Sequence, residues 1–578
     1  MTQETRAWGA AQLVPVPVAS RRADAAAIAG LLALGVGLPL VLGALSGTLV
    51  VPRNDDWAYR NIALEFARTG VLELNVRTMI VGQVVATQPM LRLSGQDPWA
   101  FAAVGVAAAS AAVLAAYALA RRFLPPVRAT LAVALLLLFP GYIAYATSYM
   151  SDVPALAPQF ACLAMGAVAL NRRPVRGRWL VGAVAVGCVA MTNRDFAIAA
   201  PAAVLVAALF AEPLRLRSWI LAAAVAAAYG ALYLLKVALY PKGGAVEITS
   251  GGFFQTMQAL AIVSLVVSPA VVVGAARWRS HLRRLDVLIG VEVGLVFGGV
   301  RLLQWVREGR LSPAILPNLT SQWGLPLREM FLGDRPPLLD DTSWAALNVL
   351  ALVATVAALG LITGIAGAYL RSAPRSPRAL LNQLGSPTGI LVGFCGAVAI
   401  GMMAYGMGSP LFDRYFWPIV PPIAVLLMYT PPRFDDARTN AQVARPARRG
   451  AVAIASVLLV GLGALSLTYA ANANAFDAAL WRAGEALAAA GVPPGEIDAG
   501  YAWVGAHATT PPTGGGTGPV RYRQIWPEFR QCGSVTTDPQ PQAGMVPVGA
   551  MSYQLFLIAG PSEPLYLFRG EAPGCRTK

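Results

Sequence analysis

The first long apolar stretch of the chain, residues 25–50, reads AAAIAGLLALGVGLPLVLGALSGTLV and continues directly into the acidic stretch VPRNDDWAY, residues 51–59. A run of this length can cross about 30 Å of hydrocarbon at about 1.5 Å per helical residue. Similar runs occur at 100–120, 130–145 and 220–240. Since only helices satisfy their backbone groups within lipid in such segments, the runs predict a polytopic α-helical membrane protein.

The composition supports this interpretation. Of the 578 residues, 56% are hydrophobic and 13% are charged, whereas a soluble domain carries about a quarter charged residues. The net charge of +16 is spread over short basic clusters between the apolar runs and does not form one stripe. This pattern indicates cytoplasmic loops, so we expect no nucleic-acid partner.

The positive-inside rule places the N-terminal segment 1–24 in the cytoplasm and predicts about thirteen spans within a transmembrane module, 25–472. An odd number of spans leaves the C-terminus outside. The first span is expected to be retained and not cleaved as a signal peptide. Short spans near 179–211 leave a re-entrant hairpin open as an alternative. The expected spans are 25–50, 98–120, 129–146, 153–170, 179–192, 196–211, 219–240, 255–275, 285–305, 343–369, 388–407, 416–430 and 451–472.

Two long loops and the tail are predicted to lie outside the cytoplasm. The loop 51–97 should begin with an interfacial amphipathic helix from Asn54, its expected N-cap, to Gly70. The second long loop is 307–342. This second loop and the tail flank the expected site, so they are candidates for setting acceptor specificity.

The tail, 473–578, is predicted to form a small α/β domain. A helix is expected over Asp477–Ala490, and strands over Tyr553–Ala559 and Leu565–Phe568. Cys532 and Cys575 lie in this outer segment, where an oxidising compartment permits a disulfide. Such a bridge closes a loop of roughly 44 residues and contributes about 4 kcal/mol in the chain-entropy model. The three cysteines within apolar runs are expected to be packing residues: Cys162, Cys188 and Cys395.

Ionisable residues that follow spans on the same predicted face are the candidate site residues. They are Asp55, Asp56, Asp152, Arg194 and Arg414. Each also has a structural interpretation. The aspartates suit the first turn or the cap of a helix, and the arginines suit neighbouring acids or lipid headgroups.

The order of these motifs resembles the C-type (GT-C) glycosyltransferases over about residues 25–430. The resemblance is to the group of protein mannosyltransferases and lipid A aminoarabinose transferases, which is glycosyltransferase family 39-like. The motifs are Asn54–Tyr59 after the first span, Ser151–Pro154, and Arg414-Tyr415 before a proline-rich helix. One departure is Thr192–Asp195, which stands where related transferases often carry a lysine–glycine element.

The resemblance implies a transferase that moves a hexosyl or pentosyl group from a polyprenyl-phosphate donor to a cell-wall glycan, lipoglycan or protein. It implies an inverting reaction in which Asp55 is the general base, with Asp56 as the alternate, while Asp152 binds the acceptor or supports the base. Arg194, Arg414 and Tyr415 would hold the donor phosphate. A divalent cation bound by the three carboxylates is left open, and a zinc centre is not expected because no histidine joins them.

The expected location is a bacterial plasma membrane, with the site facing outward, because abundant arginine and alanine are typical of GC-rich bacterial genomes. A transporter or flippase is the rival prediction, based on Glu292 and Lys236 within apolar runs. A catalytically silent assembly partner whose tail binds cell-wall polymer is a third alternative.

Overall fold

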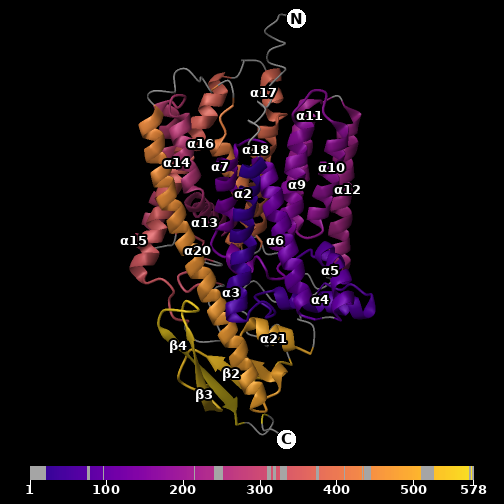
Figure 1. Ribbon diagram of the computed structural model, residues 1–578, viewed down its shortest axis with the longest axis vertical. Coiled ribbons are helices and arrows are strands. Elements are labelled where there is room, and N and C mark those ends of the chain that lie inside the picture. The colour runs from indigo at the N-terminus through magenta and orange to yellow at the C-terminus, as the bar shows by residue number, and fades with distance from the viewer. Residues whose placement is uncertain are drawn as a thin grey trace, which may run out of the picture.

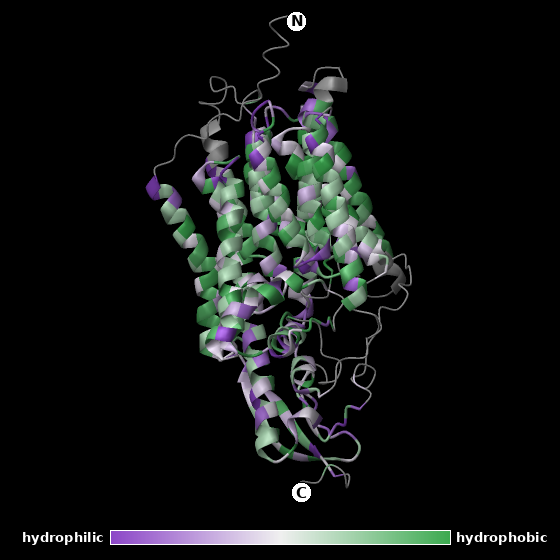
Figure 2. Ribbon diagram, turned by 90° about the vertical axis from the view of Figure 1, so that its right-hand side faces the viewer, coloured by the Kyte–Doolittle hydropathy of each residue, from purple (hydrophilic) through white to green (hydrophobic). Residues whose placement is uncertain are grey.

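The computed structural model describes residues 21–74, 78–95, 97–213, 215–239, 251–308, 314–316, 320–325, 335–372, 377–408, 411–431, 434, 444–509, 526, 528–571 and 575. A bundle of long helices forms most of the molecule, and a small sheet extends from one end of it (Figure 1). Hydrophobic residues dominate the bundle, and hydrophilic residues gather at its two ends and around the sheet (Figure 2). The protein is therefore a polytopic α-helical membrane protein.

Every predicted span contains a helix. In the described residues, seven helices are long and apolar enough to cross a membrane, or eight if the bent pair α13–α14 is one span, and three apolar helices are shorter. The number thirteen stays a prediction. The helices of the bundle are α2 Arg21–Leu32, η1 Ala33–Gly37, α3 Leu38–Ser46, α6 Trp99–Ala120, α7 Pro126–Leu137, α8 Tyr142–Tyr145, α9 Asp152–Leu170, α10 Gly177–Met191, η2 Asp195–Ile198, α11 Ala199–Ala211, α12 Leu216–Leu239, α13 Gly251–Val266, α14 Ser268–Trp278, α15 Arg284–Glu308, α16 Asp341–Ser372, α17 Pro377–Leu384, α18 Pro387–Gly406, η3 Asp413–Ile419, α19 Val420–Met428 and α20 Ala444–Ala489.

Small residues allow the helices to pack closely. At Gly290 in α15, an added Cβ would lie 2.3 Å from the Leu359 carbonyl oxygen of α16. Helix association in lipid depends on such close backbone approach, since lipid tails are as apolar as leucine. A side chain at this position would force the two helices apart.

The loops that the topology assigns to the cytoplasm contact one another at one end of the bundle. Arg121, after α6, lies 2.7 Å from Asp24 at the start of α2. Arg173, after α9, donates to the Gly385 carbonyl oxygen at 3.0 Å. The alternation of basic and acidic loops thus corresponds to two ends of the molecule, and the assignment of each end to a side of the membrane stays a prediction.

The predicted amphipathic helix is α4, Asp56–Thr69, which lies across the end of the bundle beside α5, Val81–Ser94 (Figure 1). Its N-cap is Asp55 and not Asn54, because Asn54 adopts a φ of 49° and turns the chain before the helix starts. Gly70 ends the helix with a φ of 72°, as predicted. Tyr59 and Ile62 are buried on its inner face.

The helix predicted over 477–490 is the end of α20, Ala444–Ala489, which runs from the bundle into the tail without a break (Figure 1). The expected boundary at residue 473 therefore falls inside a helix. Hydropathy changes at this point, but no proline or glycine interrupts the sequence between Leu465 and Arg482. The last helix of the bundle therefore continues into the tail.

The tail carries a four-stranded sheet of order β1-β2-β4-β3. β1 pairs with β2 in parallel, and β4 pairs antiparallel with β2 and β3. The disulfide between Cys532 and Cys575 is present, with a Cα–Cα distance of 5.2 Å. The other elements of the tail are η5 Pro494–Glu496, β1 Ile497–Asp498, α21 Tyr501–His507, β2 Gly533–Thr536, β3 Met545–Gln554 and β4 Ser562–Gly570.

The predicted strand over Tyr553–Ala559 is wrong for most of its length. β3 ends at Gln554, and the following residues form the turn to β4. The Phe556 N–H donates to the Ala559 carbonyl oxygen at 3.1 Å, and Leu557 adopts a φ of 71°. The apolar character of this run reflects the packing of Leu555 into the core and not strand pairing. The strand expected at Leu565–Phe568 lies within β4.

Candidate functional site

The segment that carries Asp55 is held by a buried polar network. The guanidinium of Arg53 donates from Nη1 to the Ala144 carbonyl oxygen at 2.6 Å and contacts the side chains of Thr48 and Asn474. Thr48 Oγ1 donates to Asn474 Oδ1 at 2.7 Å. These contacts tie the start of the loop 51–97 to α8 and α20, so the position of Asp55 is set by three separate parts of the chain.

Four charged groups meet next to this segment. Arg414 Nη2 lies 3.5 Å from Asp55 Oδ2, and Arg414 Nε lies 3.4 Å from Asp152 Oδ2. Arg194 Nη2 lies 2.6 Å from the other oxygen of Asp152. Asp152 therefore bridges the two guanidiniums. The side chains of Asp152, Arg194 and Arg414 are 3–5% exposed, whereas Asp55 is 32% exposed and is the member open to a substrate.

The cluster forms because three turns converge at the same end of the bundle. Asp152 is in the first turn of α9. Arg194 has an extended backbone between α10 and η2, and Arg414 lies at the start of η3. None of the three residues sits in the middle of a span, which agrees with the high cost of isolated charges in hydrocarbon.

Aromatic rings line the two guanidiniums. The Arg194 guanidinium carbon lies 5.2 Å from the Tyr415 ring centroid and 5.6 Å from that of Phe196. The corresponding distances from Arg414 are 5.8 Å to Tyr415 and 4.8 Å to Phe412. Cation–π contacts of this kind stabilise a desolvated cation and fix the plane of its donors. Tyr415 thus contacts both arginines.

Several donors in the cluster lack a hydrogen-bond partner. Within the described part of the chain, this holds for Nε and Nη2 of Arg194 and for Nε and Nη1 of Arg414. The contacts with Asp152 are close, but they do not have hydrogen-bond alignment, and both Asp152 oxygens also lack an aligned donor. Buried donors without partners are costly, and an anionic ligand would satisfy them.

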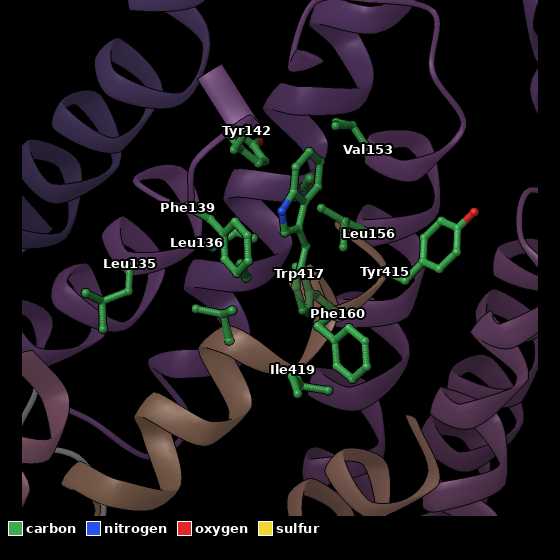
Figure 3. Close-up of a cluster of buried hydrophobic side chains, with 14 of the residues drawn as sticks. Leu135, Leu136, Phe139, Tyr142, Val153, Leu156, Phe160, Tyr415, Trp417 and Ile419 are labelled. Atoms are coloured by element: carbon green, nitrogen blue, oxygen red, sulfur yellow. The ribbon is translucent and has the colours of Figure 1, made fainter. Parts of the chain in front are cut away.

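The segment after Arg414 is fixed by an apolar cluster. Trp417 lies among Phe139, Tyr142 and Leu156, while the ring of Tyr415 points away from this group (Figure 3). The Tyr142 and Trp417 ring centroids are 5.5 Å apart. This packing anchors η3 on one side and leaves Tyr415 free to contact the arginines on the other.

Asp413 holds the other side of the Arg414 backbone. Its carboxylate accepts hydrogen bonds from the Thr320 N–H at 2.9 Å and the Arg414 N–H at 2.8 Å, and its side chain is fully buried. Burial raises the pKa of Asp413 to about 6. Sequence analysis did not single out this residue as a site residue, although it is adjacent to Arg414. It links the site to the second long loop, 307–342, through Thr320.

Asp56 is directed away from the cluster. Its oxygens accept from Arg60 Nε at 2.6 Å and Nη2 at 3.0 Å, and one of them also accepts from the Tyr149 N–H at 3.2 Å. Asp56 is fully buried. Consecutive helical residues point about 100° apart, so Asp55 and Asp56 serve different sites. The structure brings together Asp55, Asp152, Arg194, Arg414 and Tyr415 of the predicted residues, but not Asp56.

Tyr59 is a further neighbour of the cluster, which sequence reasoning did not single out. Its phenol lies within electrostatic reach of Asp55 and Arg194. The signal that could have found it is its spacing, since residues four apart share a helical face. Tyr59 closes the side of the cluster next to α4.

Partial burial changes the acidity of Asp55. Desolvation raises the pKa of its carboxyl above the ordinary value, and the positive charges of Arg414 and Arg194 oppose this rise. A carboxylate with a raised pKa is a stronger base than an ordinary aspartate, and general bases work best when their pKa is close to the operating pH.

A divalent cation does not fit the carboxylates as the structure places them. In the described segments, no group of three or more His, Cys, Asp or Glu residues is positioned to hold a metal ion. Asp56 binds Arg60, and Asp152 lies between two guanidiniums.

The prediction of a transporter rested on Lys236 and Glu292, and the structure shows where these two side chains lie. Lys236 in α12 forms an ion pair with Asp195, next to Arg194. Glu292 is exposed on the surface of α15. Lys236 is thus part of the surroundings of the site and does not mark a separate pathway with Glu292.

Residues 86–240 match the family model described as dolichyl-phosphate-mannose-protein mannosyltransferase. This segment resembles the mannosyltransferases. It contains both Asp152 and Arg194, and it confirms the resemblance that the motifs predicted. Comparison with curated proteins gives no match.

Among solved structures, the chain is similar to ArnT from Cupriavidus metallidurans bound to undecaprenyl phosphate, with 14% identity over 95% of this chain and 99% of that chain and a TM-score of 0.37. The apo state of ArnT gives 13% identity, 92% and 98% coverage, and a TM-score of 0.37. The archaeal oligosaccharyltransferase AglB from Archaeoglobus fulgidus, in complex with an inhibitory peptide and a dolichol-phosphate, gives 15% identity, 78% and 58% coverage, and a TM-score of 0.37.

Proposed function

We propose that the protein is a glycosyltransferase that moves a hexosyl or pentosyl group from a polyprenyl-phosphate donor to an acceptor hydroxyl outside the cytoplasm. The observation that carries this proposal is the buried pair Arg194 and Arg414, which lies beside the partly exposed carboxylate of Asp55. Among the described residues, Nε of Arg194 and Nη1 of Arg414 have no hydrogen-bond partner. The similarity of residues 86–240 to dolichyl-phosphate-mannose-protein mannosyltransferases supports the same class of donor.

The two arginines bind the phosphate of the donor. A guanidinium offers planar donors that match phosphate oxygens, and such charge-assisted bonds are strongest where water is excluded. Tyr415 packs against both guanidiniums and keeps their donors directed at the phosphate. The polyprenyl chain of the donor remains in the membrane lipids that surround the bundle.

Asp55 acts as the general base. It accepts the proton of the acceptor hydroxyl while the hydroxyl oxygen forms a bond to the anomeric carbon of the sugar. The bond from that carbon to the phosphate oxygen breaks, and its electron pair leaves with polyprenyl phosphate. Arg194 and Arg414 stabilise the additional negative charge. Attack in line with the leaving group inverts the anomeric configuration, and Asp55 then releases its proton to water.

Asp152 is a positioning residue in this mechanism. It lies between the guanidiniums of Arg194 and Arg414, so it sets their separation and partly neutralises them before the donor binds. Asp56 acts one step further away, because its pairing with Arg60 holds the first turn of α4 and hence the backbone of Asp55.

The proposed location is the bacterial plasma membrane, with the site on the extracytoplasmic side. The site lies at the end of the bundle from which the sheet extends, opposite the end where the basic loops gather (Figure 1). By the positive-inside rule, the basic end faces the cytoplasm.

The proposal is tested with purified protein in liposomes that contain labelled polyprenyl-phosphate hexoses or pentoses and candidate glycan, lipid and protein acceptors. The expected result is a labelled glycoside together with free polyprenyl phosphate. Movement of the labelled donor across the bilayer without a covalent product would contradict the proposal and support a flippase.

A further inference from the structure

The segment 320–325 of the second long loop lies between η3 and α20. Thr320 and Ser321 are fully buried there. The Thr320 N–H donates to Asp413 Oδ2 at 2.9 Å, and the Tyr469 hydroxyl of α20 donates to the Ser321 carbonyl oxygen at 2.6 Å. Consecutive residues of the loop are therefore bonded to the site on one side and to the last helix of the bundle on the other.

The turn formed by this segment packs directly against α20. Ser321 Oγ donates to the Gly324 carbonyl oxygen at 2.9 Å, and Gly324 adopts a φ of 105°. A Cβ at Gly324 would lie 2.4 Å from Oδ1 of Asn472, the third residue after Tyr469. Arg335, from the later part of the loop, donates from Nη2 to the same Asn472 oxygen at 2.5 Å. Tyr469 and Asn472 thus hold the loop from one face of α20.

Asp413 connects the loop to Arg414. Its two carboxylate oxygens accept from different N–H groups, Oδ2 from Thr320 and Oδ1 from Arg414 at 2.8 Å. Asp413 is fully buried, so water does not replace either bond. Buried N–H groups that lose their acceptor are costly. The backbone from which the Arg414 guanidinium extends is therefore fixed by the loop.

The contacts of the Arg414 guanidinium depend on where this backbone lies. Nη2 lies 3.5 Å from Asp55 Oδ2, and Nε lies 3.4 Å from Asp152 Oδ2. A shift of about 1 Å in a site of this kind can lower the rate of an enzyme by about 100-fold. Such a shift of Arg414 would alter both contacts and the direction of the donors that it offers to a phosphate.

We propose that the second long loop sets the position of Arg414 for the donor phosphate, and that Asp413 and Tyr469 are positioning residues that act through Arg414. This inference rests on the proposed function and names residues that control donor binding without touching the donor. The tail is part of the same support, because Asn472 Nδ2 donates to the Leu555 carbonyl oxygen at 3.0 Å.

The test compares Tyr469→Phe and Asp413→Asn with the wild type, as full-length proteins in liposomes. Phenylalanine keeps the ring but removes the bond to Ser321, and asparagine keeps one of the two acceptor oxygens. Each variant should raise the donor KM by about fivefold or more, as expected for the loss of one hydrogen bond, with kcat at saturating donor within about twofold of the wild type. A purely structural role would lower the amount of active protein, and hence the apparent kcat, and leave the KM unchanged.

The matched control is Tyr117→Phe. Tyr117 is buried, and its hydroxyl donates to Asp24 Oδ1 at 2.6 Å at the opposite end of the bundle, so this variant should keep the wild-type donor KM. In a double variant of Tyr469→Phe and Asp413→Asn, the two increases in KM should not multiply, because both changes act on one hydrogen-bond network.

Hydrogen–deuterium exchange of the η3 amides gives a readout that does not require the donor. These amides should exchange faster in Tyr469→Phe than in the wild type or in Tyr117→Phe. A wild-type donor KM in both loop variants would overturn the proposal, and so would equal exchange in η3. Faster exchange in a protein that neither binds nor transfers any polyprenyl-phosphate sugar would support the link between the loop and Arg414 and refute the proposed function.

Discussion

Arg194 Nη2 lies 2.6 Å from Asp152 Oδ1, although α9 and α10 separate the two residues in sequence. Both side chains are almost completely buried. The pair brings a cation to the end of the bundle and leaves Nε of the guanidinium without a partner among the described residues. An anion that reaches this point finds a donor that has already been desolvated.

The first prediction concerns this pair. Arg194→Ala should raise the donor KM or Kd by about 10- to 100-fold, because a hydrogen bond to a charged group contributes about 1.5–3 kcal/mol. Binding of the labelled polyprenyl-phosphate donor measures the change. The matched control is Arg68→Ala, since Arg68 pairs with Glu65 on the exposed side of α4. Equal donor affinity in both variants would rule out the phosphate role of Arg194.

The second prediction separates Asp56 from Asp55. Asp56→Ala should lower the free energy of unfolding by about 3–5 kcal/mol, because it leaves the buried guanidinium of Arg60 unpaired. Glu65→Ala removes an exposed ion pair on the same helix and should change stability by less than about 1 kcal/mol. Thermal unfolding of both variants in the same detergent makes the comparison. A fully stable but inactive Asp56→Ala protein would instead indicate that Asp56 takes part in the chemistry.

The third prediction is a pH dependence. Because burial raises the pKa of Asp55 and the base works only when ionised, the transfer rate should fall as the pH decreases through a value above that of an ordinary aspartate. The rate is measured against pH at saturating donor. Asp413→Asn should keep this acidic limb, although burial raises the pKa of Asp413 to about 6. A limb that disappeared in Asp413→Asn would assign the titration to that residue.

The fourth prediction tests the contact between the tail and α4. A Cβ at Gly505 would lie 2.2 Å from the Trp57 ring, so Gly505→Ala should displace the start of α4 and with it Asp55. We expect kcat to fall by about 10- to 100-fold, as for other small misplacements of catalytic groups, with little change in donor affinity. Gly549→Ala meets no atom within 4 Å and is the control. Unchanged kcat in a folded Gly505→Ala protein would show that this contact does not position Asp55.

The sequence predicted the positions of the helices well, because the thickness of a bilayer sets the length of each apolar run. It also predicted that Asp152, Arg194 and Arg414 share one face, since alternate loops of a bundle meet at the same end. Two features depend on contacts that no local pattern contains. The first feature is the buried pair of Asp56 and Arg60. The spacing of four residues allows the ion pair, but its surroundings come from distant residues such as Tyr149, whose N–H donates a further hydrogen bond to the carboxylate.

The second such feature is the continuity of the last helix. The polar residues after Ala473 suggested that a new domain begins there. No proline or glycine lies between Leu465 and Arg482, so the change from apolar to polar residues does not end the helix. Similarly, the apolar run at Tyr553–Ala559 matched a strand by composition. The chain turns at Leu557, which has a positive φ, and Tyr553 and Leu555 pack into the core.

The most direct test of the account is the rate of sugar transfer by Asp55→Asn in liposomes, measured beside the wild type at saturating donor. Asparagine keeps the shape of the side chain but removes the base. The account predicts a rate about 100- to 10,000-fold lower, with the donor still bound by Arg194 and Arg414. Turnover equal to that of the wild type would contradict the assignment of Asp55 as the base.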